Sequence, residues 1–465
     1  MESSRIIISH LLPCAEYSAN NAFNYNGNNG NLNNNNKNNT NSCRAVLELG
    51  EPNNADLESF PIPLSEVYRM YRKTRRHKAS KPSHLIFRLN YPHELRRICY
   101  EINTMTYTPS TSIAFIVTKP KWREVIAADF RDRVAQTILV QELLPYLEAY
   151  EHPHSYSCRV GKGCLAAVQR LQELNSKYKD GVVCFTDLAN FFMSIDVDLW
   201  IPKLLKFMDD RMPKGDRTEV FKRLAETIYY HRSQDHCIRK SPLWMWDELP
   251  KRKSLFHSTT GLPIGNVTSQ TLANFITTEI LYLVETIGFE FAFYTDDKGD
   301  FMTKEDKPRY LAYLPIISQY VWDNCRLKVH PHKMYMQDVA KGFNAFGFRI
   351  KGNNITPSKR LVHHFKRLVG YLHLLVEEDV RNLYLYREEA RNRLNSYLGL
   401  LCHSHSYNLR KQAIVSLQNS KWREVLNFGV GYRKVSIKPS KTRLMYFRRM
   451  NRMRLREQTL IFHTV

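Results

Sequence analysis

The chain has 465 residues, of which 43% are hydrophobic, and this is enough to build two or three compact units with cores of their own. Lysine and arginine number 68 against 45 acidic residues, so the formal net charge of +23 favours a polyanionic partner without specifying any sequence. No apolar run reaches the length of a membrane span. The nine cysteines are scattered and form no Cys-x-x-Cys pair, so neither a disulfide framework nor a zinc knuckle is indicated. We therefore expect a globular protein of a reducing compartment, the cytoplasm, with no membrane partner.

Residues 1–56 differ in composition from the rest of the chain. The stretch from Asn20 to Asn41 is mostly asparagine and cannot bury a core of its own, so we expect it to be disordered or a loop. Mixed helical and strand patterns begin at about Asp56, and the folded part of the protein is expected to start there.

The segments that follow predict helices and strands that carry basic residues. Residues 64–78 are typical of a basic amphipathic helix and residues 93–105 of a second helix, and a strand follows over 111–119. Residues 120–150 begin as a charged turn and strand and then become a long helix. Basic side chains on and beside this strand could clamp a triphosphate or form a solvated strand edge; they are Lys119, Lys121 and Arg123.

Three acidic residues follow runs that favour strands. Asp187 follows the apolar run from Gly181 to Phe185, and Asp296 and Asp297 form the doublet of YTDD between two aromatic-rich stretches. We expect the doublet at a hairpin tip, with the earlier acid on a neighbouring strand. Clustered carboxylates hold Mg²⁺ against a triphosphate, which indicates a nucleic-acid polymerase. By itself, an Asp-Asp doublet is also common in ordinary surface turns.

The block GLPIGNVTSQ, residues 261–270, is a Gly/Pro loop that opens an apolar helix over 271–288. Its small residues permit close approach of another backbone, so the loop could contact a nucleotide or template. Thr268 or Ser269 could also serve as an ordinary N-cap of the helix, and both interpretations can hold at once.

The remaining elements continue the mixed pattern and then become basic and helical. We expect an amphipathic helix over 309–325, followed by short strands over 328–336 and 343–350 that close the sheet. From about Asn353 to the end the pattern is helical and rich in arginine, with no further acidic cluster. This part is expected to face nucleic acid.

In chain order, these motifs resemble those of the reverse transcriptase family from about Leu57 through at least Ile350. The resemblance implies an α+β fold, the right-hand polymerase of fingers, palm with an antiparallel sheet, and helical thumb. The implied ranges are 57–180 for the fingers, 181–350 for the palm with interleaved fingers elements, and 351–465 for the basic helical thumb. The motifs that carry it are KPKWREVIAADFRDRVAQ (fingers), SYSCRVGKG (between fingers and palm), CFTDLANFFMSID (first catalytic motif), GLPIGNVTSQ (loop motif), YTDD (second catalytic motif), LKVHPHK (lysine motif) and FNAFGF (primer grip).

The same resemblance implies roles for residues of this chain. The catalytic acids would bind two Mg²⁺ ions, with Mn²⁺ as an alternative; they are Asp187, Asp296 and Asp297. Lys333 would donate a proton near the leaving pyrophosphate. Phe192 falls at the steric gate that excludes a 2′-hydroxyl, although a core aromatic would give the same pattern. The nucleotide-binding residues would be Lys119, Arg123, Phe192, Ile264, Gly265, Ser269 and Gln270, and the primer grip would be Phe346 and Gly347.

The loop motif narrows the resemblance to a subfamily. Many relatives read Pro-Gln-Gly and end in Ser-Pro, whereas this chain reads Pro263, Ile264, Gly265 and ends in Ser269 and Gln270. GLPIGNVTSQ is similar to the enzymes of bacterial and phage diversity-generating retroelements, which copy a template-repeat RNA with errors at adenines to diversify a variable protein gene. The resemblance implies template RNA, cDNA, dNTPs and a basic accessory protein of the variability-determinant type as partners.

The asparagine tract fits this subfamily, because residues 1–56 resemble the variable region of a lectin-like target protein. We interpret them as a translated template repeat, with the native start nearer to Met70. Asn codons are AAT or AAC, so errors at their adenines sample many residues and never create a stop codon. The open alternatives are a low-complexity tail for this segment, a retron, intron-encoded or phage-defence enzyme for the family, and a catalytically idle RNA-binding scaffold.

Overall fold

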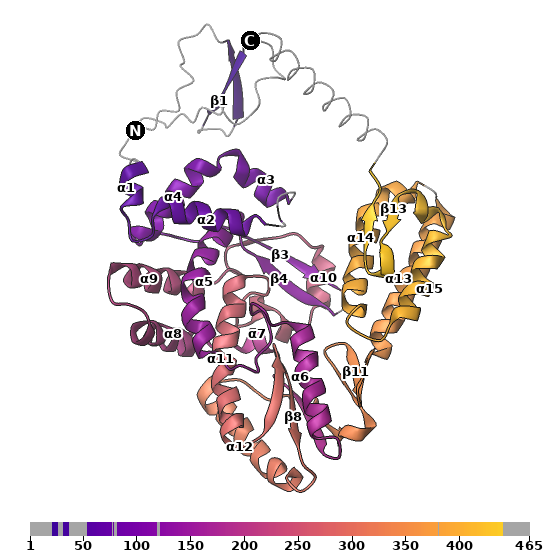
Figure 1. Ribbon diagram of the computed structural model, residues 1–465. Coiled ribbons are helices and arrows are strands. Elements are labelled where there is room, and N and C mark those ends of the chain that lie inside the picture. The colour runs from indigo at the N-terminus through magenta and orange to yellow at the C-terminus, as the bar shows by residue number, and fades with distance from the viewer. Residues whose placement is uncertain are drawn as a thin grey trace, which may run out of the picture. The chain divides into compact units, whose positions relative to one another are not determined.

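The computed structural model describes residues 21–26, 31–36, 54–76, 78, 81–118, 121–379 and 381–439 (Figure 1). The chain forms two compact units, each made of separated segments. The first unit comprises Met1–His152, Leu188–Leu283 and Ile316–Val329, and the second comprises Pro153–Asp187, Val284–Pro315 and His330–Val465. The boundaries of these units differ from the predicted ranges of fingers, palm and thumb. The division into fingers, palm and thumb therefore stays a prediction.

The first unit is mostly helical. Its helices are α1 (Asn54–Glu58), α2 (Leu64–Thr74), α3 (Pro82–Leu89), α4 (Tyr91–Asn103), α5 (Phe130–Tyr150), α7 (Phe191–Ser194), α8 (Val197–Arg211), α9 (Asp216–Tyr230) and α10 (Leu243–Glu248), with short 3₁₀ turns at Lys251–Lys253 and Leu255–His257. Helices α11 (Val267–Thr286) and α12 (Lys307–Cys325) have residues in both units. The predicted helices over 64–78 and 93–105 are confirmed as α2 and α4.

A three-stranded sheet accompanies these helices, in the order β4-β3-β6. Strand β3 (Ser112–Val117) pairs antiparallel with β4 (Arg123–Ala127) and parallel with the short β6 (Cys237–Arg239). The burial of β4 alternates along its length, which leaves Arg123 exposed at its start. The predicted order of strand, strand and long helix is confirmed by β3, β4 and α5, whereas residues 119 and 120 of the predicted charged turn lie outside the described residues.

The second unit is built on an antiparallel sheet of four strands in the order β7-β8-β5-β9. Its strands are β5 (Val182–Asp187), β7 (Glu290–Tyr294), β8 (Asp297–Met302) and β9 (Tyr335–Asp338), and α6 (Cys164–Lys177) packs against β7. Gly299 of β8 pairs with Phe185 of β5, and a Cβ atom at 299 would lie 2.6 Å from the Phe185 ring. The close passage of this ring therefore requires glycine.

The strands predicted over 343–350 do not close this sheet, so that prediction is wrong. They form β10 (Phe343–Ala345) and β11 (Phe348–Lys351), which pair with β12 (Asn354–Pro357) in a separate sheet of three strands. Only β9, from the region of the first predicted strand, joins the four-stranded sheet, where it pairs with β5. The tight turn between β10 and β11 makes them partners of each other, and β12 takes the outer edge of β11.

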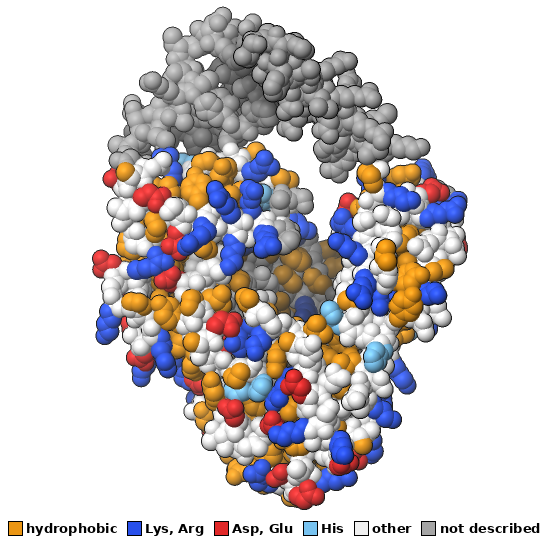
Figure 2. All heavy atoms as spheres, in the orientation of Figure 1, with side chains coloured by type: hydrophobic (Ala, Val, Ile, Leu, Met, Phe, Trp, Pro, Cys, Tyr) orange, Lys and Arg blue, Asp and Glu red, His pale blue; other side chains and the backbone are white. Residues whose placement is uncertain are grey.

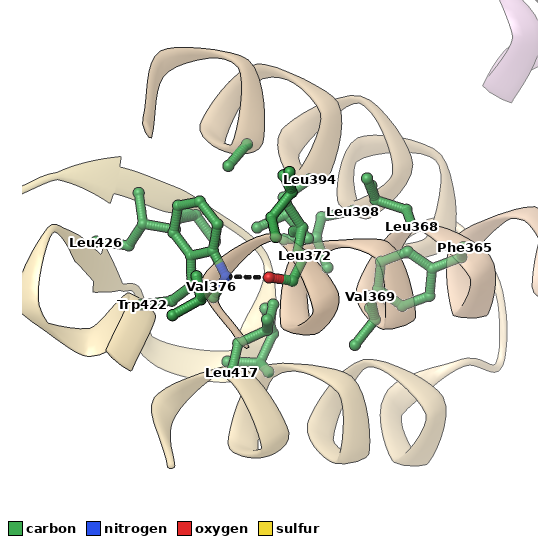
Figure 3. Packing of buried hydrophobic residues seen from close by; sticks show 14 of the residues in the cluster. Phe365, Leu368, Val369, Leu372, Val376, Leu394, Leu398, Leu417, Trp422 and Leu426 are labelled. Atoms are coloured by element: carbon green, nitrogen blue, oxygen red, sulfur yellow. Dashed lines mark hydrogen bonds between the residues drawn. The ribbon is translucent and has the colours of Figure 1, made fainter. Parts of the chain in front are cut away.

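The C-terminal part of the second unit is helical, as predicted, with α13 (Lys359–Glu378), α14 (Asn382–Leu401) and α15 (Tyr407–Gln418). A short antiparallel pair, β13 (Leu426–Phe428) and β14 (Val435–Ile437), was not expected from the helical pattern. Figure 3 shows the core of this region, in which Trp422 is fully buried among aliphatic side chains and donates its indole N–H to the Leu372 carbonyl at 2.7 Å.

Trp422→Phe is expected to destabilise this helical core. The smaller ring leaves a void, and the buried Leu372 carbonyl loses the indole donor, so we expect a cost of about 1–3 kcal/mol. Urea unfolding followed by circular dichroism measures the change. A matched surface variant, Trp244→Phe, removes an indole that is 55% exposed and should leave stability unchanged. Equal midpoints for the two variants would contradict the prediction.

Two short strands occur in the asparagine-rich segment, where composition predicts disorder or a loop. Strands β1 (Asn21–Asn26) and β2 (Asn31–Asn36) pair antiparallel, which differs from that prediction for these residues. Backbone groups alone can make such a ladder, so it does not need a core. The rest of residues 1–53 and residues 440–465 lie outside the described part of the chain. Among the described helices, none combines the length and apolar character needed to span a bilayer.

Candidate active site

The YTDD motif lies at the tip of the β7–β8 hairpin, as predicted. Tyr294 and Asp297 are Cα partners across the two strands, so Thr295 and Asp296 form a two-residue turn. Thr295 has a φ of +63°, and the Asp296 N–H donates to the Tyr294 carbonyl at 2.9 Å. Buried strands on both sides thus hold the acidic doublet where the chain reverses.

Asp187 lies on the neighbouring strand, directly opposite the doublet. It ends β5, and its Cα partner across the antiparallel pair is Asp297. Residues that face each other in this way place their side chains on the same face of the sheet. The structure therefore brings Asp187 and Asp297 together, with Asp296 adjacent in the turn, within one unit.

Lys333 contacts the first of these acids. Its ammonium pairs with Asp187 Oδ2, and the loop that carries it is held to the same strand by a hydrogen bond from the His330 N–H to the Asp187 carbonyl at 2.7 Å. The side chain of Lys333 is about half exposed. A partly exposed ammonium next to the acids suits charge neutralisation and proton donation.

The carboxylate of Asp187 fits a divalent cation. Asp187 is 9% exposed, and its Oδ1 is buried without a hydrogen-bond partner, an arrangement that costs free energy unless a cation or donor approaches. Within the described ranges no group of three His, Cys, Asp or Glu side chains forms a metal site, so the metal-binding role of the three acids stays a prediction. Lys333 pairs with the other oxygen of Asp187.

The predicted primer grip forms the turn between β10 and β11. Phe346 and Gly347 have φ values of +51° and +91° and connect the partners Ala345 and Phe348. The Phe346 ring lies 5.3 Å from the ring of Tyr294, measured between centroids. Burial raises the pKa of the Tyr294 hydroxyl. An aromatic contact thus joins this turn to the acidic hairpin, although the two belong to different sheets.

A buried charged pair lies on the opposite face of β8, and sequence reasoning missed it. Lys298 Nζ lies 3.1 Å from Asp300 Oδ2, and the hydroxyl of Tyr310 on α12 donates to the same oxygen at 2.7 Å. Asp300 and Tyr310 are fully buried, and burial followed by the charge of Asp300 raises the pKa of Cys184 to about 12. The only sequence signal is the K-G-D alternation directly after the acidic doublet.

The loop motif packs in the first unit against the segment that carries Phe192. The Leu262 N–H donates to the Phe192 carbonyl at 2.7 Å, and a Cβ atom at Gly261 would lie 2.8 Å from the Met193 carbonyl oxygen, so only glycine fits there. The Ile264 carbonyl accepts from the N–H of Ile126 on β4 at 3.3 Å. The loop therefore contacts both the Phe192 segment and the strand that begins at Arg123.

The side chains of the predicted nucleotide-binding residues differ in accessibility. Phe192 and Ile264 are half-buried, and Ile264 packs on a small apolar cluster that includes Ile126. Gly265 and Gln270 are exposed, whereas Ser269 is buried. Lys119 lies outside the described residues.

Helix α11 begins at Val267, so the expectation of an N-cap at Thr268 or Ser269 is wrong. Both residues lie inside its first turn and are 2% exposed. The residue before the helix, Asn266, is buried, and its side-chain oxygen accepts from the Ala128 N–H at 3.4 Å.

Basic side chains are spread over the surface of the described residues. Figure 2 shows Lys and Arg side chains over much of the face in view, among hydrophobic side chains and with acids between them. This distribution agrees with the formal net charge of +23 and suits contact with a phosphate backbone.

Solved structures with a similar chain path include two telomerases. The telomerase from Candida albicans in complex with a TWJ fragment of telomeric RNA matches 67% of this chain and 60% of its own, with 12% identity and a TM-score of 0.38. Apo telomerase from Candida tropicalis matches 71% of this chain and 70% of its own, with 10% identity and a TM-score of 0.39. The chain thus spans less than two thirds of the Candida albicans protein. No curated protein matches it.

The family comparison covers the site itself. The model described as Reverse transcriptase (RNA-dependent DNA polymerase) matches residues 116–350, just over half of the chain. This span contains β5 with Asp187, the YTDD hairpin, Lys333 and the turn at Phe346. The chain therefore belongs to the reverse transcriptase family and has the α+β right-hand fold.

Proposed function

We propose that this reverse transcriptase copies a template-repeat RNA into adenine-mutagenised cDNA, which then diversifies a variable protein gene. The observation that carries the proposal is the loop motif, with Ile264 between Pro263 and Gly265 and the ending Ser269-Gln270. Template RNA, cDNA and dNTPs are the ligands, and a basic accessory protein of the variability-determinant type is the proposed partner.

Three acidic residues of the second unit would bind the metal ions that the reaction needs. Asp187, Asp296 and Asp297 would hold two divalent cations, Mg²⁺ or alternatively Mn²⁺, which lower the pKa of the primer 3′-hydroxyl and offset the charge on the triphosphate. The pairing of Asp187 with Lys333 places an ammonium near these acids. Lys333 is thus the proposed donor of a proton to the leaving pyrophosphate.

The remaining residues bind and orient the reactants. Arg123, with Lys119, would hold the triphosphate through charge-assisted hydrogen bonds. Phe346 and Gly347 would brace the primer end, and the contact of Phe346 with Tyr294 couples that end to the acidic hairpin. Phe192 would select deoxynucleotides by crowding a 2′-hydroxyl.

Fidelity in this proposal depends on the residue at position 264. An aliphatic side chain cannot hydrogen-bond the incoming nucleotide, so less free energy separates a correct from an incorrect pair than an amide would provide. Ile264 is half-buried against an apolar cluster, and its backbone carbonyl is bonded to β4. These contacts hold the loop in place while offering no polar group from this side chain.

Ile264→Gln is expected to lower errors at template adenines by about tenfold, which corresponds to one hydrogen bond of discrimination. Sequencing of cDNA made from a defined RNA measures the error at each template base. Ile264→Leu keeps an aliphatic side chain at the same position and should retain the adenine errors. An unchanged adenine error in Ile264→Gln, with DNA synthesis intact, would contradict this role of the side chain.

The asparagine tract supports the same proposal because its codons are rich in adenine. If residues 1–56 are a translated template repeat, their Asn codons are the adenine-rich positions at which errors should concentrate. Errors in cDNA copied from this stretch should fall on the first and second bases of those codons.

Primer extension tests the proposed function. Purified protein, the accessory protein and RNA transcribed from the same locus are combined with dNTPs and Mg²⁺, and the cDNA is sequenced. Errors concentrated at template adenines support the proposal. Faithful cDNA would instead place the enzyme with retron, intron-encoded or phage-defence reverse transcriptases, and no cDNA would favour an RNA-binding scaffold.

A further inference from the structure

The turn that carries the catalytic doublet is strained. Thr295, the residue before Asp296, has a φ of +63°, which is unfavourable for a β-branched side chain and persists only where neighbouring contacts enforce it. The backbone at Thr295 sets the direction in which Asp296 leaves the turn. Whatever holds Thr295 therefore also positions this acid.

The segment before α6 runs beside β7 up to that turn. The Phe293 N–H donates to the His154 carbonyl at 3.0 Å, and the Tyr156 N–H donates to the Phe293 carbonyl at 3.0 Å, which makes a parallel bridge between Ser155 and Phe293. These bonds fix the segment in register with the catalytic hairpin. The next residue, Ser157, consequently reaches the tip.

Ser157 contacts the strained residue directly. Its hydroxyl lies 2.8 Å from the hydroxyl of Thr295, and Ser157 is only 3% exposed, so water competes poorly for this hydrogen bond. After Ser157 the chain turns at Cys158, whose φ is +55°, and the Gly163 N–H closes the loop onto the Tyr156 carbonyl at 2.8 Å. The loop that presents Ser157 is thus tied at both ends.

We propose that Ser157 is a positioning residue for the polymerase reaction: its hydroxyl holds Thr295 in the left-handed conformation and thereby places Asp296 next to Asp187 and Asp297. This role gives a function to the SYSCRVGKG segment, to which the other proposals assign none. The inference rests on the polymerase activity of the family and is independent of adenine-directed errors.

Variants of the two hydroxyl residues test this role in the full chain. Ser157→Ala and Thr295→Val each remove one hydroxyl, and the double variant removes both. We expect each single variant to lower kcat for primer extension about tenfold and to raise the Mg²⁺ concentration for half-maximal activity severalfold, while KM for the primer–template stays within about twofold. The double variant should be no worse than either single variant, because both remove the same hydrogen bond.

Two further variants separate positioning from folding. Ser157→Thr retains a hydroxyl and should restore most of the activity lost in Ser157→Ala. Thr295→Gly relieves the strain, since glycine adopts a positive φ freely, so adding Ser157→Ala to it should cost less than it does in the parent chain.

Three results would overturn the proposal. The first is an unchanged Mg²⁺ concentration for half-maximal activity in Ser157→Ala. The second is a loss of kcat in the double variant that equals the product of the two single losses. The third is a loss of activity that is fully explained by a lowered melting temperature. A failure of the adenine-error experiment would leave these measurements valid, because they need only DNA synthesis on a defined template.

Discussion

Asp187→Asn is expected to abolish DNA synthesis, with a loss in kcat of roughly 10³-fold or more. Asp187 lies opposite Asp297 in the register of β5 and β8, and its buried Oδ1 has no hydrogen-bond partner within the described residues. An amide has nearly the same shape but cannot supply the negative charge that a divalent cation requires. RNA binding should change by no more than about twofold, because the proposed phosphate contacts come from the basic surface rather than from Asp187.

The measurement is primer extension at saturating dNTPs and Mg²⁺, with RNA binding followed by fluorescence anisotropy. Asp180→Asn is the matched control, because Asp180 is exposed just before β5 and should leave synthesis unchanged. The scaffold interpretation makes the opposite prediction, since a protein that only binds RNA would keep its function in Asp187→Asn. Synthesis that survives in this variant would remove Asp187 from the catalytic set.

The strands and helices around the site could be predicted because their local patterns are strong. The apolar run before Asp187 and the aromatic residues before the doublet each fit a buried strand, and a hairpin with an acidic tip follows from their spacing. Long helices such as α5 and α12 have apolar periodicity over many residues. The hairpin with its acidic tip was therefore predictable from sequence.

The partners of the short strands could not be predicted in the same way. A pattern of alternating residues indicates a strand but not the strand with which it pairs, and this is why Phe343–Ala345 was wrongly assigned to the four-stranded sheet. The turn at Phe346 and Gly347 decides that pairing, and phenylalanine is not a residue that signals a turn with positive φ. The contact of Ser157 with Thr295 spans 138 positions of sequence and leaves no local signal.

The buried pair of Lys298 and Asp300 on β8 gives the second large expected effect. In the sequence, Lys298 and Asp300 resemble exposed charges on a strand. In the structure both are buried, and the Tyr310 hydroxyl of α12 donates to Asp300. Removing one member of a buried pair leaves an uncompensated charge, so Lys298→Met is expected to destabilise the protein by about 3–5 kcal/mol. Lys304→Met, at an exposed position just after β8, is the matched control and should have little effect.

A double variant distinguishes lost charge pairing from lost packing. The deficit of Lys298→Met is measured by urea unfolding. Lys298→Met combined with Asp300→Leu removes both charges and should recover most of the lost stability. A deficit that persists in the double variant would show that packing, rather than the charged pair, holds this face of β8.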